Sequence, residues 1–256
     1  MSNNERESAL AMDLARRVYL YRLWQVVFGG PLTDDGVSKV FCSEALALFD
    51  HVREALSQSD FEEIAACPVG LSGLSLGTCA EGVFACIEKV GCEVDGPSQE
   101  AAFARVLRDD YSKLFQVPGD RYVHLWESPY TGKESMVFQE STLDVRSFYH
   151  DAGFKLQAEG HFPDDHIAAM MDYMAHLGQR AYEAYADGRD DEVLLVLATQ
   201  RQFADRHILT WVNLFADRVI KNDAHAYYGA LAGGMAAFVR VDRVMIEQLE
   251  KNLTEQ

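Results

Sequence analysis

Long apolar runs are missing from this sequence of 256 residues. A helix needs about 20 consecutive apolar residues to cross a bilayer, and the longest runs, such as residues 193–198, are far shorter. We therefore expect no stable insertion into a membrane.

Cysteine occurs in no pattern that binds metal or builds a disulfide framework. The five cysteines are odd in number, and no two have CxxC spacing. Unpaired thiols suit a reducing compartment, so we expect a cytoplasmic protein whose cysteines are mostly small core residues. They are Cys42, Cys67, Cys79, Cys86 and Cys92.

Positive charge is scarce. Lys and Arg number 23 against 40 Asp and Glu, which gives a formal net charge of −17 at pH 7. Nucleic acid and anionic membrane surfaces are poor candidate partners because both are polyanions. The charge favours a cationic partner, although an acidic balance also serves solubility alone.

Strand alternation is nearly absent, and helical periodicity dominates. We predict an all-α fold, a globular bundle of about ten helices with a central non-helical hinge. One domain spans residues 1–256, with a helical part over about 1–118, a hinge loop over about 119–140 and a second helical part over about 141–256. Capping residues, glycines and prolines place helices at about 5–28, 33–56, 59 onward, 78–90, 97–117, 141–152, 163–187, 190–221 and 224–251.

The sequence also allows predictions for an arginine pair in the first helix and for an aspartate in the last. Arg16-Arg17 is similar to a twin-arginine export signal, but acidic residues precede it and Arg22 interrupts the apolar stretch. We therefore place both arginines on the polar face of the first helix. Asp242 stands in an apolar seam and needs a hydrogen-bond donor, for which His207 or Arg206 are the candidates. His207 itself is expected to be a hydrogen-bonded core residue.

Motifs of catalysis are also lacking. The glycine-rich segment 70–77 lacks the lysine of a P-loop, and Ser128 lacks a G-x-S-x-G elbow. Asp164, Asp165, His161 and His166 cluster in sequence, but carboxylates at a helix start are ordinary capping groups. We expect neither a metal site nor an enzyme.

One central segment has no helical period. A loop of about twenty residues in a helical protein usually indicates either a function or a wrong assignment of elements, and this one contains Trp126-Glu127-Ser128-Pro129-Tyr130. With the Pro163-Asp164-Asp165-His166-Ile167 motif, it resembles the TorD/DmsD family of redox-enzyme maturation chaperones. Supporting motifs run along most of the chain: Arg17, Leu20, Tyr21, Phe28 and Pro31-Leu32; Tyr111, Leu114-Phe115 and Pro118-Gly119; Asp172-Tyr173-Met174; and Phe203, His207-Ile208, Trp211, Phe215, Tyr227-Tyr228, Phe238 and Asp242. The family often has glutamate before the hinge proline, where this chain has Phe162.

The resemblance implies a cytoplasmic chaperone without turnover. Such proteins bind the twin-arginine signal peptide, or the apo form, of a molybdenum-cofactor oxidoreductase and hold it until the cofactor is inserted. Weak guanine-nucleotide binding is associated with some members, but no nucleotide motif supports it here, and we expect no cofactor. The protein is expected to be a monomer or a domain-swapped dimer.

The predicted binding residues combine acids for guanidinium groups with aromatic surface for the apolar part of the peptide. They are Trp126, Glu127, Ser128, Tyr130, Asp165 and His166, with Phe162 and Tyr173 as additional contacts. Glu127 either touches the guest or holds the loop in shape. Two other functions remain open: a nucleotide-handling or hydrolytic enzyme that uses the Asp164–His166 cluster, and a structural helical subunit of a larger assembly.

Overall fold

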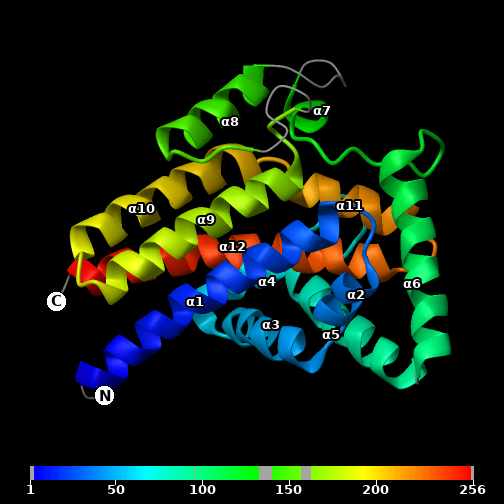
Figure 1. The fold of residues 1–256 in the computed structure, drawn as a ribbon, viewed down its shortest axis with the longest axis horizontal. Coiled ribbons are helices and arrows are strands. Elements are labelled where there is room, and N and C mark those ends of the chain that lie inside the picture. The colour runs from blue at the N-terminus through cyan, green and yellow to red at the C-terminus, as the bar shows by residue number, and fades with distance from the viewer. Residues whose placement is uncertain (1–2, 95, 133–139, 157–162, 255–256) are drawn as a thin grey trace.

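Helices make up most of the chain in the computed structural model, which describes residues 3–94, 96–132, 140–156 and 163–254 (Figure 1). Apart from two isolated bridges, these residues contain no β-structure. The all-α prediction is therefore confirmed. None of the helices in these ranges combines the length and hydrophobicity of a membrane-spanning segment.

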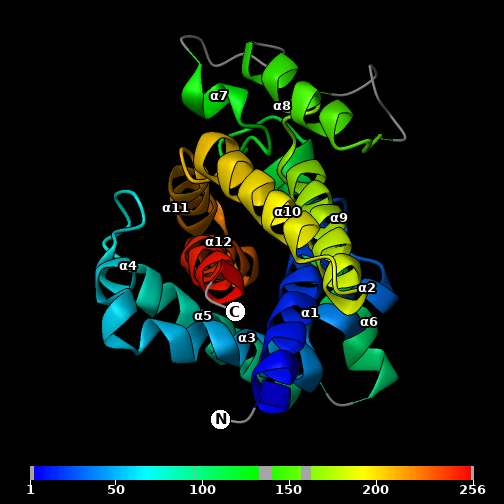
Figure 2. The same ribbon diagram turned by 90° about the vertical axis from the view of Figure 1, so that its left-hand side faces the viewer.

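The first helix, α1 (Asn3–Phe28), lies alongside α9 (Ile167–Ala186) in both ribbon views (Figures 1 and 2). Gly178 permits the close approach, since a Cβ there would lie 3.1 Å from the Val18 side chain. The two helices join parts of the chain that are far apart in sequence. They form the side of the bundle on which the candidate site lies.

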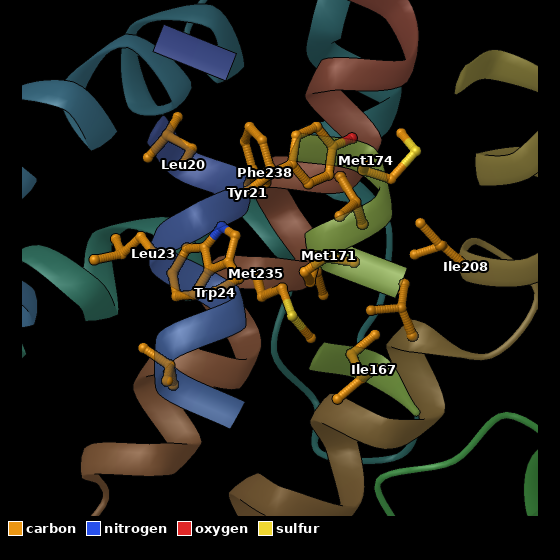
Figure 3. Close-up of a cluster of buried hydrophobic side chains, with 14 of the residues drawn as sticks. Leu20, Tyr21, Leu23, Trp24, Ile167, Met171, Met174, Ile208, Met235 and Phe238 are labelled. Atoms are coloured by element: carbon orange, nitrogen blue, oxygen red, sulfur yellow. The ribbon is translucent and has the colours of Figure 1, made fainter. Parts of the chain in front are cut away.

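The last helix, α12 (Tyr227–Thr254), runs through the middle of the bundle (Figure 2). It packs against α5 (Leu76–Glu93), α10 (Asp190–Phe203) and α11 (Val212–Asn222). A Cβ at Gly234 would lie 2.2 Å from Val83, so only glycine allows this contact between α12 and α5. Figure 3 shows the hydrophobic core between these helices, where Tyr21 and Trp24 of α1 lie near Met171 of α9 and Phe238 of α12.

Two long helices predicted from the sequence are each broken in the structure. The first gives α2 (Asp34–Val40), which Thr33 caps as predicted, and α3 (Ser43–Leu56), which Cys42 caps. The break places the Phe41 ring 5.2 Å from that of Phe103. Residues 190–221 divide into α10, a π segment at Ala204–Ile208 and α11. Tertiary packing, which periodicity does not report, overrides helix propensity at both places.

The remaining elements follow the predicted order. A 3₁₀ turn (Ser59–Phe61) leads into α4 (Glu62–Ala66), and the glycine-rich loop then leads to α5. Next, α6 (Pro97–Tyr111) continues into a second π segment (Ser112–Gln116). The described part of the predicted hinge loop contains the short helix α7 (Ser128–Thr131), and α8 (Glu140–Asp151) follows. Residues 133–139 of that loop lie outside the described residues.

Asp242 is fully buried and bonded, as predicted, but its partners lie on α1. It accepts hydrogen bonds from Arg17 Nη2 (3.1 Å) and the Tyr21 hydroxyl (2.6 Å). Arg17 also donates to Gln200 (2.9 Å). The prediction that Arg17 lies on a polar face is therefore wrong: its side chain is an internal counter-ion, because a buried carboxylate needs one. Arg16 stays partly exposed and pairs with Asp13.

Candidate functional site

The predicted hinge loop and the Pro163–Ile167 motif, which together we call the hinge, are joined by their backbones. Trp126 and His166 form an isolated antiparallel bridge. The Glu127 amide donates to the Asp165 carbonyl (3.0 Å), and the Ile167 amide donates to the Leu125 carbonyl (2.8 Å). The two sequence motifs, about forty residues apart, therefore meet at the start of α9.

Both hinge aspartates are buried and fix the bridge to its surroundings. The Asp165 carboxylate accepts the Ser128 amide (2.9 Å) at the start of α7. The Asp164 carboxylate accepts from Arg146 of α8 (2.6 Å), and its carbonyl accepts the Tyr149 hydroxyl (3.0 Å). The prediction that Pro163-Asp164-Asp165 forms the first turn of a helix is wrong, since α9 begins at Ile167. These residues instead complete the hinge.

His166 caps α9. Its Nδ1 accepts the Ala168 amide (3.1 Å), which places the ring proton on Nε2 when the imidazole is neutral. Burial lowers the pKa of His166 to about 4, so the ring is neutral at pH 7. The Trp126 ring lies edge-on to it, with 5.1 Å between the ring centres. This pair presents an uncharged, largely aromatic surface.

Glu127 points into the protein. Its side chain is nearly fully buried and is hydrogen-bonded to Nδ1 of His207 (3.1 Å). The other ring nitrogen of His207 lies 3.1 Å from the Asp144 carboxylate of α8, which also contacts Arg206. Burial raises the pKa of Glu127 above its ordinary value, although the His207 hydrogen bond opposes the shift. His207 is a bonded core residue, as predicted.

The tyrosines of the predicted site support the hinge from within. The Tyr130 ring lies 5.0 Å from that of Trp211, and its hydroxyl donates to the His124 carbonyl (2.8 Å). Tyr173 is fully buried and donates to the Phe148 carbonyl (3.0 Å). Phe162 and His161 lie outside the described residues.

A groove of about 960 Å³ lies over the hinge bridge. Of the predicted binding residues, only Trp126 and His166 are among its described lining; Glu127, Ser128, Tyr130, Asp165 and Tyr173 are not. The lining comes from the end of α1, the end of α6 and the π segment after it, the hinge, the segment after α8 and the first turns of α9: Gln25, Gly29, Gly30, Tyr111, Phe115, Gln116, Tyr122, Leu125, Trp126, Lys155, Leu156, Pro163, His166, Ala168, Ala169 and Asp172.

Four of these lining residues belong to the family motifs but were not predicted as site residues. Tyr111, Phe115 and Asp172 lie in the supporting motifs and Pro163 lies in the hinge motif, and that placement was the available signal. Nothing in the local sequence marks Gln25 or Gly29 as groove residues. They line it only because α1 packs against α9: a Cβ at Gly29 would lie 3.7 Å from that of Ala168.

Asp172 is the only acidic residue among the described lining residues, and Lys155 is the only lysine or arginine there. Asp172 forms an ion pair with Arg22 of α1. Asp164, Asp165 and His166 form hydrogen bonds with three different residues and not with one another. Of the three, only His166 lines the groove. The described lining of the groove therefore combines aromatic and apolar side chains with one acid and one lysine.

Comparisons with known proteins support the sequence motifs. The family model described as nitrate reductase delta subunit matches residues 87–217, which include the hinge. The chain is 30% identical over 144 residues to a chaperone protein TorD of Vibrio cholerae, covering 56% of this chain and 63% of that protein. It is 29% identical over 157 residues to one of Shewanella oneidensis, covering 59% and 65%.

The alignments thus span less than two thirds of the length of these relatives. The family model nevertheless covers half of this chain and contains both hinge motifs. The chain belongs to the TorD/DmsD family of redox-enzyme maturation chaperones.

Proposed function

We propose that this protein is a cytoplasmic chaperone for a molybdenum-cofactor oxidoreductase subunit. It binds the twin-arginine signal peptide of that client, its apo form or both, and releases it for export after cofactor insertion. It acts by binding alone, without turnover and without a resident cofactor. Membership of the TorD/DmsD family supports this role.

The observation that carries the proposal is the groove over the hinge. Four aromatic residues line it, namely Tyr111, Phe115, Tyr122 and Trp126, and its volume of about 960 Å³ is of the size that holds a small ligand or a few peptide side chains. A twin-arginine peptide has two guanidinium groups followed by an apolar stretch. The aromatic wall suits the apolar stretch, and the net charge of −17 suits the arginines.

The predicted site residues take two different roles in this proposal. Trp126 and His166 form the wall that the guest touches. Glu127, Ser128 and Asp165 act from beneath, because their bonds to the rest of the chain set the position of that wall. Tyr130 stiffens the same loop through its contact with Trp211.

Titration calorimetry with a synthetic twin-arginine leader peptide tests the proposal. We expect one peptide per chain, weaker binding when both arginines are replaced by alanine, and weaker binding as the salt concentration rises. A Trp126→Ala variant should lose affinity while keeping its helical spectrum. If the peptide fails to bind at every salt concentration tested, the signal-peptide role is contradicted.

A pull-down with mass spectrometry identifies the client and tests the two alternatives. Recovery of an oxidoreductase subunit with a twin-arginine leader supports the chaperone. Stable recovery of a partner without such a leader would favour a structural subunit. Nucleotide turnover by the purified chain, lost in a His166→Ala variant, would favour the enzyme that uses the Asp164–His166 cluster.

A further inference from the structure

The one acidic residue among the described groove lining, Asp172, is not among the predicted binding residues. Glu127 and Asp165 have buried side chains and bond to His207 and the Ser128 amide. Neither carboxylate is offered to a guest in this conformation. Asp172 keeps about 29% of its side chain exposed and lines the groove.

Asp172 already has a guanidinium partner. Arg22 of α1 donates from Nη1 to Oδ1 of Asp172, across the contact between α1 and α9. The Arg22 side chain is about half exposed, and it is not among the groove-lining residues. The pair therefore stands at the margin of the groove, because Asp172 lines the groove and Arg22 does not.

We propose that Asp172 binds a guanidinium group of the guest and that Arg22 is a built-in competitor for the same carboxylate. The inference rests on the proposed function and names the residue that selects the cationic part of the peptide. A carboxylate can accept two parallel bonds from one arginine, and Arg22 holds only one oxygen. A partly exposed ion pair is weak and exchanges readily. The guest arginine can therefore displace Arg22.

The position of Asp172 also orients the guest. It lies six residues after His166, and α9 begins at Ile167, so the two are about 9 Å apart along the helix at 1.5 Å per residue. An extended peptide covers that distance in about three residues. The arginine at Asp172 therefore places an apolar side chain about three positions away against Trp126 and His166.

The test measures binding of a labelled twin-arginine peptide by fluorescence anisotropy to four single variants and to the double variant that carries Arg22→Gln and Asp172→Asn. Asp172→Asn and Arg22→Gln change the pair, whereas Asp13→Asn and Arg16→Gln change a partly exposed ion pair elsewhere on α1. Each control matches its partner in net charge, so long-range attraction cancels in the comparison. Thermal melts of all five variants verify that the fold is retained.

We expect Asp172→Asn to weaken binding about tenfold relative to Asp13→Asn, the range for a charge-assisted bond at a partly exposed site. Arg22→Gln should tighten binding relative to Arg16→Gln, and this gain should vanish when Asp172→Asn is also present. Equal affinities within each matched pair, or weaker binding in Arg22→Gln, would overturn the inference while the proposed function stands. A wild-type protein that binds no peptide would instead refute the proposed function.

Discussion

Replacing Asp165 with alanine should destabilise the hinge rather than remove a direct contact with the guest. The Asp165 carboxylate is fully buried and accepts the Ser128 amide at 2.9 Å. A hydrogen bond to a charged group contributes about 1.5–3 kcal/mol, and its loss leaves a buried amide without its acceptor. At about 2–4 °C per kcal/mol for a domain of this size, the melting temperature should fall by about 3–12 °C.

Thermal unfolding followed by circular dichroism measures this change. Asp165→Asn keeps an oxygen that can accept the Ser128 amide, so it should lose less stability than Asp165→Ala. Asp13→Asn, which changes a partly exposed ion pair of α1, is the control and should stay within about 0.5 kcal/mol of wild type. If Asp165→Ala melts like wild type but binds no peptide, Asp165 contacts the guest directly and the hinge argument fails.

Two further predictions concern buried charges. Asp242→Ala leaves Arg17 buried without its counter-ion and should cost about 3–5 kcal/mol in urea denaturation; a loss below about 1 kcal/mol would contradict the assignment. Burial raises the pKa of Glu127 in the folded state. The free energy of unfolding of wild type, relative to that of Glu127→Gln, should therefore be greatest at a pH below the ordinary glutamate pKa near 4.5. It should decline as the pH rises through the folded-state pKa of Glu127. Urea denaturation at pH 5 and pH 7.5 measures that difference, and a constant or increasing difference would refute it.

Many of the helix ends can be predicted from the residues at those ends alone. The Gly29-Gly30-Pro31 stop matches the end of α1, and Thr33 caps α2. Proline and glycine act through their own backbone preferences, so neighbouring sequence is enough to read them. The breaks at Phe41 and after Phe203 depend instead on rings and helices distant in sequence, and no local pattern records them.

The same distinction separates what could be predicted of the site. The sequence motifs named Trp126 and His166, and the structure pairs them. The burial of Glu127 and Asp165 could not be predicted, because the sequence does not distinguish a loop carboxylate that faces water from one that accepts an internal hydrogen bond. Arg17 was misplaced for that reason too: its partner Asp242 lies 225 residues away in sequence.

Hydrogen exchange with and without a twin-arginine peptide tests whether the guest binds in the groove over the hinge. We expect slower exchange of backbone amides in residues 111–128 and 166–172, which hold most of the groove lining, with little change in α3 and α4. Slower exchange confined to another surface, such as the cleft between α2 and α6 lined by Val37 and Phe103, would show that the guest does not bind in the groove over the hinge.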